Sequence, residues 1–265
     1  ISSGSDYGKT ELGKGKRVLV EFVSANPTGP MHIGNARGGA LGDSLSSVLQ
    51  FAGYEVEREF YVNDAGNQIE KFGKSLSIRY MQIADGNKSD VIASYGDEDV
   101  CRKIFEDEEN FPMPEDVYKG VDIIAQHQDT TAPKFVNADE ESRKSALVEY
   151  ALPLNIDGLE KDLQKYRIVY DTWFRESSLH KSGAVKQIVD MLTEKGQTYE
   201  KDGAIWFKAS DFGDDQDRVL VRANGIPTYF VPDIAYHYNK LVTRGFDKAI
   251  DILGADHHGY IARMK

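Results

Sequence analysis

The sequence predicts an α/β fold in which a parallel sheet is interrupted by a mostly helical insertion. Residues 17–62 show strand, helix and strand patterns in turn, residues 67–200 carry mostly helical periods, and strand patterns return after residue 200. The chain has 265 residues, 40% of them hydrophobic and 28% charged, which is enough for one large domain or two small ones.

The first strand and helix form a β-α-β unit with the strand that follows. Residues 17–23 are an apolar run typical of a buried strand, apolar spacing predicts a helix over residues 31–52, and a second strand is predicted at residues 54–62. Such a unit is a right-handed crossover between parallel strands. The turn before His32 and the Asn63-Asp64 pair should therefore lie at one sheet edge, where ligands bind in such folds.

The predicted helix is unusual in its glycines. Gly34, Gly38 and Gly42 share one face, although each interior glycine costs about 1 kcal/mol relative to alanine. Such a face suits the close approach of a strand backbone or a ligand. His32 and Asn35 lie on one side of the first turn, where the helix dipole favours an anion. We interpret this turn as a phosphate site; the alternative is a tightly packed helix with an incidental histidine.

The middle section has helical periods with short breaks between them. They predict helices at residues 69–83, 91–105, 117–128, 135–152, 156–166 and 184–195. The acidic run at residues 106–109 is interpreted as a solvated helix end or loop and not as a metal site.

Strand patterns mark the last part of the chain. Asp202-Gly203 and Asn224-Gly225 predict the turns of two hairpins, at residues 198–207 and 218–230. A helix over residues 232–241 and a buried strand over residues 248–254 are predicted to follow.

A polar cluster comes directly after that last strand. Gly254 and Gly259 bracket Asp256, His257 and His258, which suits a backbone that passes close to a ligand lined by polar side chains. A metal site is the alternative. Neighbouring residues rarely converge on one ion, and no further histidine or glutamate has suitable spacing, so no metal site is predicted.

The segment from Val20 to Asn35 contains Asn-Pro-Thr-Gly-Pro-Met-His-Ile-Gly-Asn. It resembles the first signature of class I aminoacyl-tRNA synthetases, and within that class it is similar to the bacterial arginyl-tRNA synthetases. The resemblance implies a Rossmann-like, nucleotide-binding catalytic domain with His32 and Asn35 as catalytic residues. The family's signature usually ends in a second histidine, whereas Asn35 offers an amide donor that cannot carry a positive charge.

The resemblance also implies two ligand sites. For ATP, which brings Mg²⁺, the implied residues are His32, Gly34, Asn35, Gly254, Asp256, His257 and His258. For L-arginine, the implied residues are Glu21, Ser24 and Asn26 at the α-amino and carboxylate end, Tyr229 and Asp233 at the guanidinium, and His257 close to the amino acid. The reaction implied is formation of arginyl-adenylate, followed by transfer of arginine to tRNA(Arg).

The residue types suit this assignment, although each has a simpler alternative. A guanidinium is planar and always charged, and it is best met by a carboxylate with an aromatic face beside it. Glu21 lies in an apolar strand, where a charge is costly unless it is paired. The alternatives are an edge-strand Glu21 that points to water and an Asp233 that only complements the helix dipole.

Composition limits the partners and the compartment. The net charge is −11 and the pI is about 5.1, so tRNA(Arg) is expected to contact local basic patches or regions absent from this chain. No apolar run approaches the ~20 residues of a membrane span, and no signal peptide opens the chain. The single Cys101 excludes an internal disulfide. We expect a cytoplasmic protein without a membrane partner.

The expected organisation has four parts: a linker at residues 1–16, the first half of the catalytic domain at 17–66, a helical insertion at 67–200, and hairpins with the truncated second half at 201–265. The lysine-containing loop of the resembled class does not occur before Lys265. We therefore expect a catalytic fragment that is largely inactive alone. Two alternatives stay open: a class I synthetase for another amino acid such as glutamine or glutamate, and a synthetase-like module that binds nucleotide without turnover. A cysteine-specific synthetase is disfavoured because Cys101 is the only cysteine, and the helical residues 66–200 argue against a small nucleotidyltransferase.

Overall fold

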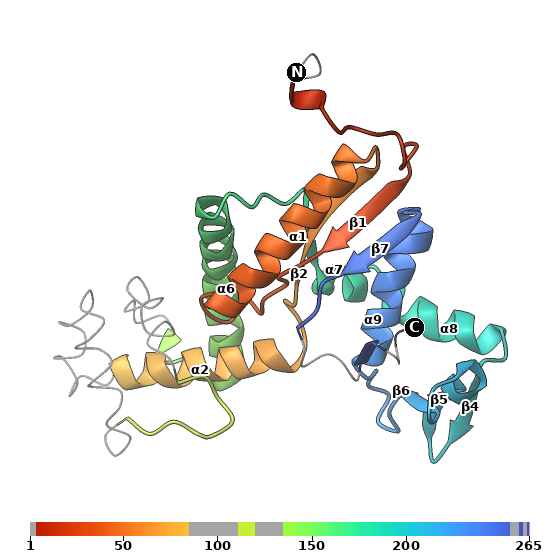
Figure 1. Cartoon of the computed structure of the whole chain (residues 1–265). Helices are drawn as coiled ribbons and strands as arrows, with labels where there is room; N and C mark the ends of the chain where they lie inside the picture. The colour runs from red at the N-terminus through yellow and green to blue at the C-terminus, as the bar shows by residue number, and fades with distance from the viewer. Residues whose placement is uncertain (1–3, 85–110, 120–134, 255–259, 262–263, 265) are drawn as a thin grey trace. The chain divides into compact units, whose positions relative to one another are not determined.

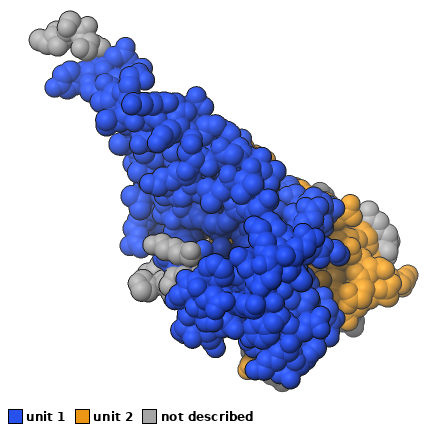
Figure 2. Space-filling view, turned by 90° about the vertical axis from the view of Figure 1, so that its right-hand side faces the viewer, with its two compact units in different colours: residues 1–25, 33–62, 166–265 blue, residues 26–32, 63–165 orange. Residues whose placement is uncertain are grey.

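The structure is a computed structural model that describes residues 4–84, 111–119, 135–254, 260, 261 and 264 (Figure 1). It divides into two compact units. The first contains Ile1–Ala25, Ile33–Val62 and Tyr166–Lys265, and the second contains Asn26–His32 and Asn63–Lys165 (Figure 2). Each unit is described by itself.

The first unit is built on a four-stranded parallel sheet with the order β3-β2-β1-β7. Its strands are β1 (Arg17–Glu21), β2 (Glu55–Val62), β3 (Thr172–Arg175) and β7 (Lys248–Asp251). The predicted α/β fold and its β-α-β unit are confirmed. The chain proceeds from β1 to β3 on one side and returns to β7 on the other, so the topological switch point lies between β1 and β7.

Helix α1 (Ile33–Phe51) covers one face of the sheet, and two of its glycines allow the close approach that the sequence predicted. A Cβ on Gly42 would lie 2.1 Å from Cγ of Phe22, and one on Gly39 would lie 2.7 Å from Cδ1 of Ile168. Gly38 differs, because no described residue outside its own stretch of helix lies within 4 Å of the position that its Cβ would take. Protein packing therefore explains Gly39 and Gly42 but not Gly38.

Three helices form a second hydrophobic core with the other face. They are α7 (Glu176–Lys181), α8 (Ala184–Glu194) and α9 (Phe230–Tyr238), and their buried side chains pack with Tyr61 of β2 and Phe174 of β3. Helix α9 continues into a π-helical turn at Asn239–Thr243. Both faces of the sheet are therefore covered by helices.

A small antiparallel sheet extends the first unit. It contains β4 (Thr198–Lys201), β5 (Ala204–Phe207) and β6 (Arg218–Val221), with a short 3-10 helix at Ala209–Phe212. The β4–β5 hairpin is confirmed, and its turn residues Asp202 and Gly203 have φ angles of 54° and 75°. The second predicted hairpin is reduced to a single bridge between Val221 and Pro227, because the chain turns into α9 at Phe230.

The second unit contains α2 (Asn67–Ala84) and α6 (Glu140–Lys165), which pack on one another. The sequence predicted two helices where α6 runs unbroken through Pro153. Buried apolar residues on both sides of Pro153 lie on one stripe, so packing outweighs the hydrogen bond that proline removes. Asp139 begins α6 by accepting a hydrogen bond from the Ser142 amide. The helix predicted at residues 91–105, most of that at 117–128, the acidic run and Cys101 lie outside the described residues.

Two predicted boundaries differ from the structure. Residues 10–16, expected to be a linker, are hydrogen-bonded to the α1–β2 turn: the Thr10 amide donates to Phe51 O and the Gly13 amide to Ala52 O. Strand β3 and helices α7 and α8 fall within the expected insertion but belong to the first unit. The difference arises because a four-residue strand gives too short a pattern to separate it from the helices around it.

Among the residues that the structure describes, none of the helices is both long enough and apolar enough to span a membrane.

Candidate active site at the carboxyl ends of the strands

The chain leaves β1 in a strained conformation beside the topological switch point. Val23 and Ser24 have φ angles of 68° and 42°, in the left-handed region that non-glycine residues rarely adopt. Valine is β-branched, which makes its positive φ especially unfavourable. Such strain persists where the surrounding structure fixes it, and it is concentrated at functional sites.

Three carboxylates form a row across the sheet at this edge. Glu21 of β1 is in register with Glu59 of β2 on one side and with Asp251 of β7 on the other. Side chains in register on neighbouring parallel strands point to the same face, so these three project together toward α9 and the π-helical turn. Ionised side by side without a cation, they would repel one another strongly.

Lys240, on the π-helical turn, neutralises two of these carboxylates. Its side chain is fully buried, and Nζ lies 2.5 Å from Oε2 of Glu21 and 2.7 Å from Oδ1 of Asp251. The amino group also lies 4.0 Å from the ring centroid of Tyr236. Burial lowers the pKa of Lys240, but Glu21 and Asp251 outweigh that effect, so its pKa is raised overall.

Arg244 neutralises the third carboxylate. Its guanidinium lies 2.6 Å from Oε2 of Glu59 and 2.5 Å from Oε1 of Glu57. The Tyr236 hydroxyl donates a 2.6 Å hydrogen bond to the other oxygen of Glu59. Burial raises the pKa of Glu59, and the tyrosine and the arginine offset only part of that effect.

Glu21 and Ser24, which were predicted to bind arginine, lie together. The Ser24 hydroxyl donates a 2.9 Å hydrogen bond to Oε1 of Glu21 and accepts one from the Tyr61 amide. Glu21 is 8% exposed and lies on an interior strand, so the structure excludes the alternative of an edge-strand charge pointing to water. Its charge is paired, as its apolar setting requires.

Tyr229 and Asp233 lie one turn apart at the start of α9. Asp233 is half-buried and accepts a hydrogen bond from the Tyr260 hydroxyl, and burial raises the pKa of its carboxyl. In the part of the chain that the structure describes, no basic side chain forms an ion pair with Asp233. Tyr229 is 60% exposed. It lines an open pocket of about 370 Å³, together with Arg218, Val219, Thr228, Phe230 and Tyr260.

His237 connects Asp233 to the row of carboxylates. One ring nitrogen lies 2.8 Å from the backbone oxygen of Asp233, and the other lies 2.9 Å from Oδ2 of Asp251. Burial is the largest single effect on the pKa of His237 and lowers it, but the hydrogen bond and charge of Asp251 and the bond to the Asp233 backbone together outweigh burial, so the pKa is raised overall. Burial alone would raise the pKa of Asp251, yet His237 and Lys240 lower it to about 2.

The structure describes five of the other predicted site residues. Gly34 is exposed and Asn35 is half-buried in the first turn of α1, and Gly254 is exposed after β7. Asn26 and His32 are exposed and belong to the second unit. Asp256, His257 and His258 lie outside the described residues.

Sequence reasoning did not identify Lys240, Asp251, His237, Glu59 or Arg244 as part of the site. Asp251 could have been found by the reasoning used for Glu21, since both are carboxylates at the end of an apolar strand. Lys240 follows Asp233 by seven residues, which is two helical turns, and this spacing places both on one side of α9. No local pattern could have shown that Glu59 and Glu21 are in register.

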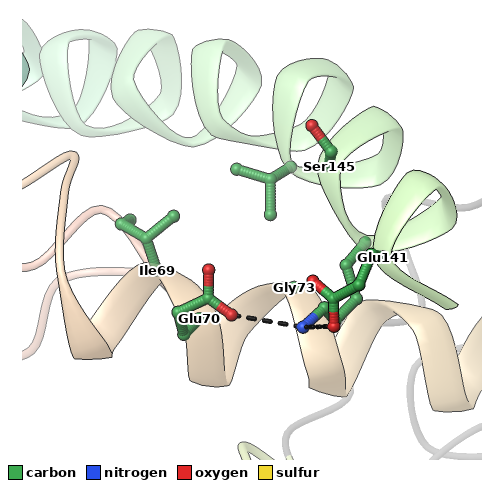
Figure 3. A pocket seen from close by; sticks show the side chains of 7 residues that line it. Ile69, Glu70, Gly73, Glu141 and Ser145 are labelled. Atoms are coloured by element: carbon green, nitrogen blue, oxygen red, sulfur yellow. Dashed lines mark hydrogen bonds and ion pairs between the residues drawn. The ribbon is translucent and has the colours of Figure 1, made fainter.

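A second pocket, of about 170 Å³, lies between α2 and α6 in the second unit (Figure 3). Glu70 and Glu141 approach the amino group of Lys144 there, at 3.2 Å and 2.7 Å. A Cβ on Gly73 would lie 3.0 Å from Cγ2 of Val148, so this glycine allows the two helices to approach closely. The pocket contains none of the predicted site residues.

The parallel sheet with its switch point between β1 and β7, and the glycine-faced helix after its first strand, define a doubly wound, Rossmann-like α/β domain. The comparisons identify the family within that class. The family model described as tRNA synthetases class I (R), catalytic domain, matches residues 1–264, and the chain belongs to this family.

Individual relatives agree with the family assignment. The chain is 53% identical over 263 residues to an arginine–tRNA ligase of Acetivibrio thermocellus, covering 98% of this chain and 43% of the relative. It is 47% identical to the arginine–tRNA ligase of Bacillus subtilis, covering 100% of this chain and 44% of that protein. The chain thus spans less than half the length of these curated relatives.

A solved structure from Campylobacter jejuni, provisionally assigned as an arginyl-tRNA synthetase, has a TM-score of 0.77 and 37% identity. The match covers 99% of this chain and 53% of that chain. The predicted Rossmann-like class I fold is therefore confirmed.

Proposed function

We propose that this chain is the catalytic portion of an arginine–tRNA ligase, which activates L-arginine with ATP and transfers it to tRNA(Arg). The observation that carries the proposal is the carboxyl of Asp233. It is half-buried beside the exposed ring of Tyr229, and no described basic side chain forms an ion pair with it. A buried carboxylate is unfavourable unless a cation meets it, and a guanidinium is a cation that also stacks on an aromatic ring.

The charges around Asp233 favour the same ligand. Lys240 and Arg244 form ion pairs with Glu21, Asp251, Glu57 and Glu59, whereas no ion pair among the described residues includes the carboxyl of Asp233. The excess of negative charge suits a ligand with two cationic ends. In the proposed complex the α-amino group of arginine meets Glu21 and Ser24, and its guanidinium meets Asp233 and Tyr229. Asn26 and His257 complete the predicted arginine site.

The features of α1 support ATP as the second substrate. Its first turn contains no acidic side chain, and a helix N-terminus favours a phosphate. The open position at Gly38 leaves room for a ligand to approach the helix backbone. We propose that His32, Gly34 and Asn35 contact the phosphates. Gly254, Asp256, His257 and His258 are proposed for the rest of the nucleotide, and Mg²⁺ would arrive with ATP.

The proposed chemistry needs no general base. The arginine carboxylate is already an anion, and it attacks the α-phosphorus of ATP. A new P–O bond forms, the bond to the leaving pyrophosphate breaks, and arginyl-adenylate remains. Positioning and the stabilisation of charge on the phosphate oxygens supply the catalysis.

The second step transfers the arginyl group to RNA. A hydroxyl of the terminal ribose of tRNA(Arg) attacks the carbonyl carbon, and AMP leaves. We propose that the tRNA is held mostly by parts of the longer relatives that this chain does not span. The proposed compartment is the cytoplasm.

Calorimetric titration of the 265-residue chain with arginine, lysine and glutamate tests the proposal. We expect arginine to bind most tightly and Asp233→Asn to weaken its binding by at least tenfold, the cost of about one charged hydrogen-bonded contact. Asp217→Asn is the matched control, because Asp217 also accepts a hydrogen bond from a tyrosine, Tyr199, but lies just before β6 of the small sheet. Tighter binding of glutamate than of arginine would overturn the assignment.

A further inference from the structure

Lys240 is the buried charge whose role the proposed chemistry leaves unexplained. It lies on the π-helical turn, where the Arg244 amide donates to the oxygen of Asn239, five residues earlier. Single π-helical turns are rare and often occur at functional sites. Burying an ammonium group costs several kcal/mol, and an apolar side chain of similar volume often stabilises a fold equally well. Lys240 therefore needs an explanation beyond filling space.

Its contacts join the two ends of the proposed arginine site. On one side, Nζ binds Oε2 of Glu21, and the other oxygen of Glu21 accepts from Ser24. On the other side, Nζ binds Oδ1 of Asp251, whose second oxygen meets His237. His237 in turn meets the backbone oxygen of Asp233. A continuous chain of hydrogen bonds thus runs from Ser24 to Asp233, with Lys240 at its centre.

The two ends depend on Lys240 to different degrees. Asp233 is held by the backbone of α9 and by the Tyr260 hydroxyl, neither of which requires the lysine. Glu21 stands beside Asp251 in register on the next strand, and without the cation the two carboxylates would repel one another. The orientation of the Glu21 carboxylate is therefore the feature that Lys240 controls.

We propose that Lys240 is a positioning residue that holds the Glu21 carboxylate toward the α-amino group of arginine, at a fixed spacing from Asp233. The inference rests on the proposed function, since it concerns the same site. It makes Lys240 a determinant of selectivity for arginine over an otherwise identical compound that lacks the α-amino group. Lys240 itself does not touch the substrate in this arrangement.

The test compares two ligands that differ only at the α-amino group. Arginine carries the α-amino group that Glu21 would meet, whereas δ-guanidinovalerate keeps the carboxylate and the guanidinium but lacks that amine. Calorimetric titration of the wild-type chain and Lys240→Met with each ligand should separate the two ends. We expect Lys240→Met to weaken arginine binding about tenfold and to change δ-guanidinovalerate binding less than about twofold. Lys240→Arg should restore part of the preference, because a guanidinium can also bridge two carboxylates.

Arg79→Met provides the matched control. Arg79 is also a buried cation, 1% exposed, but it lies on α2 in the second unit. Its loss should leave the ratio of the two affinities unchanged. If Lys240→Met fails to fold, the double variant Lys240→Met/Asp251→Asn is titrated with the same two ligands. This variant also removes one of the two carboxylates that would repel one another.

The outcomes separate the two proposals. If the wild-type chain does not prefer arginine to lysine and glutamate, the proposed function fails. If the wild-type chain does prefer arginine, but Lys240→Met weakens both ligands equally or weakens neither, the role of Lys240 is refuted while the proposed function stands. A selective loss of arginine binding, restored in part by Lys240→Arg, supports the inference.

Discussion

The glycines of α1 provide a test of how closely this helix packs on the sheet. Gly42 and Gly38 are one helical turn apart on the same helix, yet their surroundings differ. A Cβ on Gly42 would lie 2.1, 2.4 and 2.6 Å from three carbons of Phe22, a side chain with no exposure, whereas one on Gly38 would meet no described residue outside its own stretch of helix within 4 Å. Alanine should therefore have opposite effects at the two positions.

The magnitudes follow from two opposing effects. Replacing an interior helical glycine with alanine stabilises a helix by about 1 kcal/mol. At Gly42 the new methyl group would require Phe22 and β1 to move by more than 1 Å to reach ordinary contact distance. Overpacking of this kind costs typically ~1–3 kcal/mol, and this site is at the severe end of that range. We expect Gly42→Ala to lower the free energy of unfolding by about 2 kcal/mol and Gly38→Ala to raise it by up to about 1 kcal/mol.

Urea unfolding followed by circular dichroism measures both changes, and the slope of the transition checks that unfolding stays two-state. Calorimetric titration with ATP adds a second measurement for Gly38→Ala. If ATP approaches the helix at Gly38, this variant should bind ATP more weakly although its fold is more stable. The reasoning is refuted if Gly42→Ala is as stable as the wild-type chain, or if Gly38→Ala is equally destabilised.

Two further predictions concern the row of carboxylates. Arg244 is the cation closest to the fully buried Glu59, so Arg244→Met should lower the free energy of unfolding by about 3–5 kcal/mol. Adding Glu59→Gln to this variant should recover part of the loss, because it removes the unpaired charge. A loss below about 1 kcal/mol in urea unfolding of Arg244→Met would contradict this prediction. The pKa of Asp251 is lowered from 3.8 to about 2, so its stabilising effect is present above pH 4 and disappears as the pH falls toward 2. The difference in unfolding free energy between the wild-type chain and Asp251→Asn should shrink by about 2 kcal/mol over that range, and a constant difference would show that the shift is absent.

Features specified over a few residues were predicted well. The β-α-β unit followed from apolar spacing, the β4–β5 turn from Asp202-Gly203, and the close packing of α1 from the recurring glycines. The pattern predicts two helices, at residues 135–152 and 156–166, where the structure has the single helix α6 with Pro153 inside it. Only the structure shows that buried apolar residues continue along the helix beyond Pro153.

The site was predicted only in part, for a different reason. Glu21 was recognised because a charge in an apolar strand demands a partner, but its partner Lys240 lies 219 residues away in the chain. Strand β3 was missed because its four residues are identified only by their pairing with β2. Periodicity and turn residues act over a few positions and carry no information about which strands become neighbours.

The sequence alone therefore determined the fold class, the family resemblance and the glycine-rich helix, because these depend on local patterns. Tertiary structure alone decided the strand order, and through it the row formed by Glu59, Glu21 and Asp251. Buried carboxylates that become neighbours repel one another unless cations are placed among them. Lys240 and Arg244 supply these cations. Which carboxylates they meet depends on the strand order, and no single segment of the chain shows that order.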